Sequence, residues 1–146
     1  MAAKFKLQAV LNYRQSLEDQ AQQLLAASLQ KQSDLKAQLQ EQKQKLQRHD
    51  RELKVRQVDG LTVAEIDLYE SQIQHCRRLI EDILGQLQQL DQQIIFERKE
   101  LLNVARERQV MEKLKDKQEA EYQQELSRKE RAMLDEISLR NKGYNS

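Results

Sequence analysis

Proline is absent from this chain of 146 residues, and glycine occurs only three times. Proline breaks a helix most strongly and glycine next, so a chain that avoids both has almost no place to turn. The residues that it uses most, such as Leu, Gln, Glu, Lys and Arg, all favour helices. The sequence therefore predicts an all-α protein built from very few, very long helices.

The apolar residues are too few for a globular core. They make up 38% of the chain, with aromatic residues at 4%, and they form narrow stripes. Long helices with such stripes pair as coiled coils. We expect one coiled-coil domain over residues 1–146, with helices over about 4–56 and 62–140, a turn at 57–61 and a short disordered C-terminus.

The first predicted helix carries a leucine-rich stripe at helical spacing. The stripe moves by one position at Leu24 and Leu25, as expected where a helix slips relative to a strict seven-residue repeat. Towards the turn the stripe accepts polar residues, which weakens the predicted pairing. Its apolar members are Leu7, Val10, Leu11, Leu17, Ala21, Leu24, Leu25, Leu35, Leu39, Leu46 and Leu53, and its polar members are Gln32, Gln42 and His49.

Several signals mark the turn and the start of the second helix. An Asp-Gly pair occupies residues 59–60, and Thr62 with Glu65 forms an S/T-x-x-E capping box. Leu61 and Ile66 have the spacing of a hydrophobic staple. Because so short a loop returns the chain directly, the two helices are predicted to run antiparallel.

The second helix has a regular seam whose steps alternate between three and four residues, which is the pattern of a coiled coil. At 1.5 Å per residue the first helix would be roughly 80 Å long and the second roughly 115 Å. The C-terminal part of the second helix is therefore predicted to overhang. The seam comprises Ile66, Tyr69, Ile73, Cys76, Ile80, Ile83, Leu87, Leu90, Ile94, Glu97, Leu101, Val104, Arg108 and Met111.

Nothing in the sequence indicates an enzyme. Three glycines cannot build a phosphate-binding loop, and no G-x-x-x-x-G-K, G-x-S-x-G or H-E-x-x-H motif occurs. We expect no catalytic residue and no cofactor. The net charge is only +1, and acidic residues lie among the Lys and Arg residues, so we expect no nucleic-acid partner.

The adjacent pair His75-Cys76 is the one arrangement that resembles a metal site. Neighbouring helical residues point about 100° apart and do not readily chelate one ion. His49 lies on the other helix, and we expect it to be out of register with His75. Cys76 also fits the seam as a small buried residue, so no metal ligand is predicted.

The longest apolar runs are far shorter than a membrane span, and no apolar core of a signal peptide follows the N-terminus. A single cysteine cannot form an internal disulfide, which suits a reducing compartment. We expect a cytoplasmic protein that does not insert directly into a membrane.

The opening residues 5–14, FKLQAVLNYR, followed by Glu18, resemble the start of the flagellar FliJ family, in which F-x-L-x-x-V-L-x-Y-R precedes a long helix. Other parts of the chain are similar to the same family. These are the length, the turn at Gly60 with Tyr69 beyond it, and the segment 106–114 before a charged tail. The resemblance extends over nearly the whole chain.

The resemblance implies a non-enzymatic component of the flagellar type III protein export apparatus, which serves flagellum assembly, motility and chemotaxis. Such a protein would act as a central stalk that promotes assembly and activity of the export ATPase hexamer. It would link that ring to the membrane export gate protein and to export chaperones, from the inner face of the cell membrane.

The resemblance also implies which residues meet which partner. The gate-facing loop end would include His49 and Tyr69, although the first helix there carries Gln42, Lys45 and His49 where aromatic or apolar contacts are expected of the family. The ATPase-binding end would comprise Phe5, Leu7, Leu11, Tyr13, Arg14, Leu114, Tyr122, Leu126, Met133 and Ile137.

Three other functions stay open on the sequence. The rod could be a general coiled-coil chaperone that binds secreted subunits, or the stalk of a related virulence type III secretion system. It could also be a simple structural spacer, as a monomer or a dimer.

Overall fold

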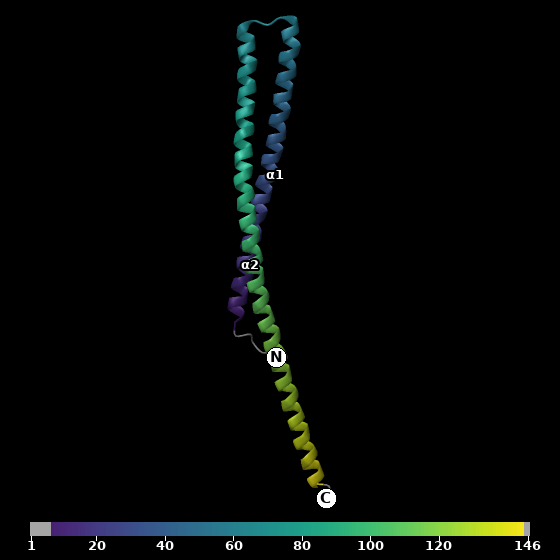
Figure 1. Ribbon diagram of the computed structural model, residues 1–146. Helices are drawn as coiled ribbons and strands as arrows, with labels where there is room; N and C mark the ends of the chain where they lie inside the picture. The colour runs from purple at the N-terminus through teal and green to yellow at the C-terminus, as the bar shows by residue number, and fades with distance from the viewer. Residues whose placement is uncertain (1–6, 145–146) are drawn as a thin grey trace. The chain divides into compact units, whose positions relative to one another are not determined.

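The computed structural model describes residues 7–144, with side chains to residue 143. Two helices account for almost all of them, α1 (Gln8–Asp59) and α2 (Val63–Tyr144), and this described part contains no strand (Figure 1). The all-α prediction with two long helices is confirmed. Residues 4–6, where the first helix was expected to begin, lie outside the described residues.

The turn lies slightly later in the chain than the sequence pattern predicts. α1 continues past residue 56 to Asp59, and residues 60–62 connect it to α2, which continues past residue 140 to Tyr144. No residue before Gly60 stops α1. Gly60 has a φ of 92°, a backbone conformation in which an L side chain is strained.

The predicted cap of the second helix is present. The backbone N–H of Glu65 donates to Thr62 Oγ1 at 3.2 Å, and the N–H of Ile66 donates to the Thr62 carbonyl at 3.1 Å. The Thr62 hydroxyl therefore satisfies the Glu65 N–H, which would otherwise have no helical partner, and the bond from Ile66 is the first regular hydrogen bond of α2.

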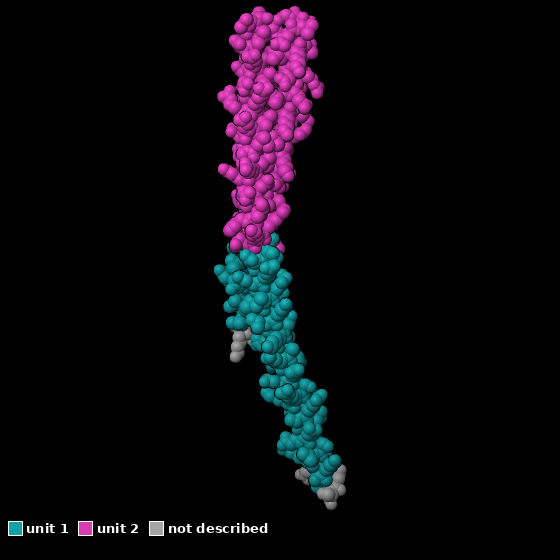
Figure 2. Space-filling model, viewed as in Figure 1, with its two compact units in different colours: residues 1–20, 101–146 teal, residues 21–100 magenta. Residues whose placement is uncertain are grey.

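The chain forms two compact units (Figure 2), and each contains a stretch of both helices. Unit 1 comprises residues 1–20 and 101–146, and unit 2 comprises residues 21–100.

In unit 2 the two helical stretches run antiparallel. Hydrogen bonds join Ser28 to Glu97, Gln32 to Asp91 and Arg56 to Tyr69, so residues progressively later in α1 meet residues progressively earlier in α2. This order of contacts is that of a hairpin around the turn at residues 60–62.

The core of unit 2 is a narrow hydrophobic cluster between the helices. Leu35 of α1 packs there with three α2 residues, Ile83, Leu90 and Ile94, and all four are buried. Partly buried leucines flank them, namely Leu25, Leu39 and Leu87. Burying a side chain of this size contributes about 1.5–3 kcal/mol, so this cluster is the main apolar contribution to the pairing in unit 2.

The seam predicted for α2 is confirmed, because each of its members from Ile66 to Met111 is buried or half-buried. The slip predicted for α1 is wrong. Leu24 is 62% exposed, whereas Leu25 is half-buried, and the alternating steps of three and four continue through this region. The buried and half-buried positions that make up the α1 seam are Leu11, Arg14, Glu18, Ala21, Leu25, Ser28, Gln32, Leu35, Leu39, Gln42, Leu46, His49 and Leu53.

Polar residues explain the difference between the predicted and observed stripes of α1. Glu18 and Ser28 occupy seam positions. A prediction from apolar residues alone does not place polar residues there. Both bond to polar residues of α2, Glu18 to Arg108 and Ser28 to Glu97. The seven-residue repeat is therefore kept by paired polar groups, and no slip of the helix is needed.

Candidate interaction surfaces

Four of the residues predicted for the ATPase-binding end lie in α1 or just before it and belong to unit 1. Leu7 and Tyr13 are exposed, but Leu11 is only 3% exposed. Arg14 is half-buried and forms an ion pair with Glu107 of α2. The surface that α1 offers here is therefore formed by Leu7 and Tyr13, while Leu11 faces the seam. Phe5, the fifth predicted residue of this segment, lies outside the described residues.

The remaining residues predicted for that end lie on α2 and also belong to unit 1. Leu114, Met133 and Ile137 are exposed, whereas Tyr122 and Leu126 are half-buried. From residue 127 to residue 143 every side chain is exposed. This stretch of α2 thus presents apolar side chains that nothing among the described residues covers.

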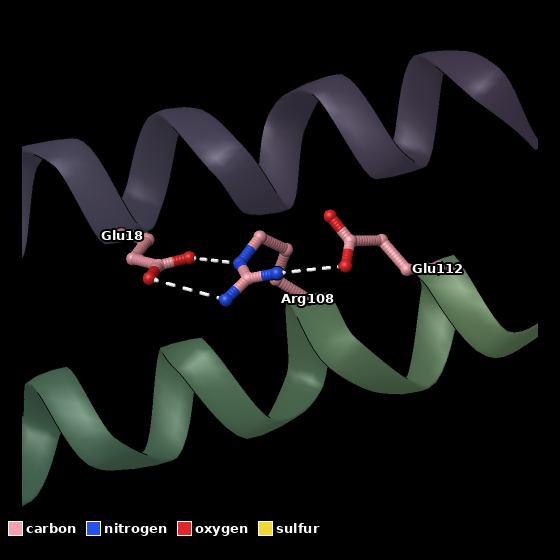
Figure 3. Close-up of polar contacts among 3 residues, drawn as sticks. All are labelled: Glu18, Arg108 and Glu112. Atoms are coloured by element: carbon pink, nitrogen blue, oxygen red, sulfur yellow. Dashed lines mark hydrogen bonds and ion pairs between the residues drawn. The ribbon is translucent and has the colours of Figure 1, made fainter.

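Ion pairs join α1 to α2 within unit 1, and Figure 3 shows those of Arg108. The guanidinium of Arg108 donates to both carboxylate oxygens of Glu18, and its Nη1 donates to Glu112 Oε2 at 2.8 Å. The hydrogen bond to Glu18, followed by that to Glu112, raises the pKa of Arg108. Arg14, four residues before Glu18, forms an ion pair with Glu107, the residue that precedes Arg108.

The regular spacing of the α2 seam predicts a seam position for Arg108, but it does not predict the partner of Arg108. The signal was the spacing of Leu11, Arg14 and Glu18, which continues the repeat of α1 with charged residues. The apolar pattern alone does not reveal such charged seam positions.

The loop end of unit 2 contains Tyr69, one of the two residues predicted to face the gate. Arg56 Nη1 donates a hydrogen bond to Tyr69 Oη at 3.0 Å, and the guanidinium carbon lies 5.9 Å from the ring centroid. The two residues line a shallow groove together with Arg51, Glu52 and Val55. Tyr69 is therefore held by α1 and only partly available to a partner.

Four apolar side chains near the turn are exposed, and none of them was a predicted contact residue. Val58 is 87% exposed and Val63 is 75% exposed, and Val55 and Leu68 are exposed as well. They could have been found as apolar residues that flank the turn but do not fit the seam. We use the name tip patch for these four residues, which share a position near the turn.

His49, the other residue predicted to face the gate, is half-buried between the helices. It lines one groove with His75 and Cys76, so the expectation that the two histidines are out of register is wrong. The Nδ1 atom of His49 is buried and has no hydrogen-bond partner among the described residues. Within residues 7–143 no group of three His, Cys, Asp or Glu side chains is arranged to hold a metal ion.

Neither helix, over the residues described, has a stretch that combines the length and the apolar character needed to cross a bilayer. Taken together, the surfaces consist of exposed apolar side chains on helices and of paired charges between them.

A family model described as "Flagellar FliJ protein" matches residues 3–143. No curated protein and no solved structure matches the chain.

Proposed function

This chain belongs to the flagellar FliJ protein family, and from that membership we propose that it is the central stalk of the flagellar type III export apparatus. Members of this family are non-catalytic components of that apparatus. In the proposed role the protein promotes assembly and activity of the hexameric export ATPase. It also links the ATPase ring to the membrane export gate protein and to export chaperones, in the cytoplasm at the inner face of the cell membrane.

The observation that carries the proposal is the uncovered C-terminal stretch of α2. Residues 127–143 are all exposed, and they include Met133 and Ile137 on one side of the helix. We infer that this stretch overhangs the end of α1 within unit 1. Burial of exposed apolar residues by a partner lowers the free energy of the complex. The overhang is therefore suited to contact the ATPase.

The stalk role is also supported by the lack of symmetry in a pair of unequal helices. A two-helix rod inside a ring of six subunits cannot touch all the subunits alike. A contact that is tighter in one conformation of a subunit shifts that subunit towards it. Such a rod can therefore change the activity of the ring without an active site of its own.

The ATPase contact is tested by mixing the purified protein with the cognate flagellar export ATPase and measuring both hydrolysis and ring formation. We expect the protein to raise both. The double substitution Met133→Glu and Ile137→Glu should abolish both effects, because it places charges on the proposed contact.

The matched control is Ala132→Glu with Leu139→Glu. Both residues are exposed, the pair adds the same two charges, and at 100° per residue they lie on a different side of α2. This variant should act like the wild type. If the wild-type protein changes neither hydrolysis nor ring formation, the stalk proposal is wrong. Tight binding to isolated export substrates without the ATPase would then favour a chaperone.

The gate contact is proposed for the tip patch together with Tyr69. The support is the exposure of Val58 and Val63 on either side of the turn. Changing both valines to Gln should weaken binding to the cytoplasmic part of the export gate protein, measured by titration calorimetry. The control pair Leu84→Gln and Val110→Gln changes two exposed apolar residues away from the turn and should bind normally. Equal affinities for both pairs would contradict the assignment.

A further inference from the structure

Ion pairs join the first part of α1 to α2 in unit 1. Arg14 pairs with Glu107. Glu18 accepts two hydrogen bonds from Arg108, and Arg108 donates a third to Glu112 (Figure 3). The Arg108 and Glu18 side chains are 22% and 14% exposed, so solvent still reaches them. The Arg14 and Glu107 side chains are 34% and 51% exposed, and an ion pair as exposed as this one contributes little and is screened by salt.

Apolar burial in the same region is slight. Leu11 is the one residue of the described part of unit 1 that is buried, whereas unit 2 buries a cluster that includes Ile83, Leu90 and Ile94. The first turn of α1 contains no acidic residue. An acidic residue there would stabilise the positive end of the helix dipole. The beginning of α1 is thus held more weakly than the middle of the hairpin in unit 2.

We propose that residues 8–20 of α1 are a movable arm, which the ion pairs of Arg14 and Arg108 clasp to residues 101–118 of α2. The arm opens while unit 2 remains paired, because local opening follows the local density of buried apolar contacts. Opening uncovers the α2 seam at Leu101, Val104 and Met111, which are half-buried in the clasped form. The clasp is a device of this fold and does not depend on the proposed stalk role.

The test is native-state hydrogen exchange, followed by mass spectrometry, on the full chain. In the double variant Glu18→Gln and Glu107→Gln we expect peptides from residues 8–20 to exchange several-fold faster than in the wild type. Peptides from residues 83–94 should keep their protection. Raising the salt concentration should speed exchange of the arm in the wild type and much less in this variant, because the charges that salt screens are gone.

The matched control is Glu41→Gln with Glu136→Gln, which removes two ion pairs that each lie within a single helix, to Lys45 and to Arg140. This variant has the same net charge as the test variant and should leave exchange of the arm unchanged. The proposal is overturned if both double variants exchange alike over residues 8–20. It is equally overturned if residues 8–20 and 83–94 lose protection together, since the hairpin would then open as one body.

Discussion

Ser28 and Glu97 meet across the seam of unit 2, where Ser28 Oγ donates a hydrogen bond of 3.0 Å to Glu97 Oε1. Gln93 Nε2 donates to the same oxygen at 2.8 Å. The other oxygen, Glu97 Oε2, is buried and has no hydrogen-bond partner among the described residues. A polar layer in a coiled coil can select one register while lowering stability. Ser28, Gln93 and Glu97 form such a polar layer.

Replacing Glu97 by Leu should therefore stabilise the hairpin. The change removes a buried acceptor without a donor, and such a group destabilises by about 1–3 kcal/mol. Part of the gain is lost because Ser28 and Gln93 lose an acceptor, so we expect the free energy of unfolding to rise by about 1 kcal/mol. Urea unfolding followed by circular dichroism measures it. Glu100→Leu, at an exposed position, should change stability little, and a less stable Glu97→Leu variant would contradict the account.

Truncating the core of unit 2 should be strongly destabilising. Leu90 is 4% exposed within the cluster, and Leu90→Ala is expected to lower the free energy of unfolding by about 2–3 kcal/mol. Leu84→Ala removes the same atoms from an exposed position, and surface changes of this kind usually stay within about 0.5 kcal/mol. Similar losses for the two variants in urea unfolding would show that the cluster is not the core.

The two glycines of unit 2 should respond in opposite directions to alanine. Gly60 has a φ of 92°, so Gly60→Ala strains the turn and should lower the free energy of unfolding by about 1–2 kcal/mol. Gly85 lies inside α2, and a Cβ there meets nothing within 4 Å. Gly85→Ala should therefore stabilise by up to about 1 kcal/mol. Thermal unfolding of both variants against the wild type shows whether the signs differ as expected.

The cap of α2 should contribute measurably to stability. Thr62→Ala removes the hydroxyl that accepts a hydrogen bond from the Glu65 N–H, and the loss of a capping side chain of this type costs about 1 kcal/mol. Thr62→Ser keeps the hydroxyl and should remain close to the wild type in urea unfolding. An equal loss for Ala and Ser would mean that the methyl group of Thr62, rather than the cap, is what matters.

Much of the fold could be predicted because helices follow local rules. The positions of the turn and of Thr62 followed from Gly60 and a capping pattern, and the seam of α2 followed from its regular apolar spacing. The seam of α1 was predicted less well, since Glu18 and Ser28 look like surface residues in the sequence. A polar residue is stable in a seam only when its partner lies opposite, and the partners are 90 and 69 residues away.

The candidate surfaces divide in the same way. Met133 and Ile137 are exposed. Their exposure agrees with the predicted overhang, in which this part of α2 has apolar residues but no apolar stripe of α1 opposite them. Burial of Leu11, in contrast, depends on the α2 seam that faces it. The tip patch was missed because Val58 and Val63 do not belong to the seam, and their exposure depends on how the chain turns between the helices.

The sequence by itself determined that this protein is two long helices joined at Gly60, since helix propensity, the absence of proline and capping act over a few residues. It also determined the α2 seam and the family, which both rest on local patterns. Only the tertiary structure decided which charges face one another, because ion pairs such as Glu18 with Arg108 form across a distance that no local spacing encodes. The same long-range pairing decided that Arg14 binds Glu107 and that the repeat of α1 continues without a slip.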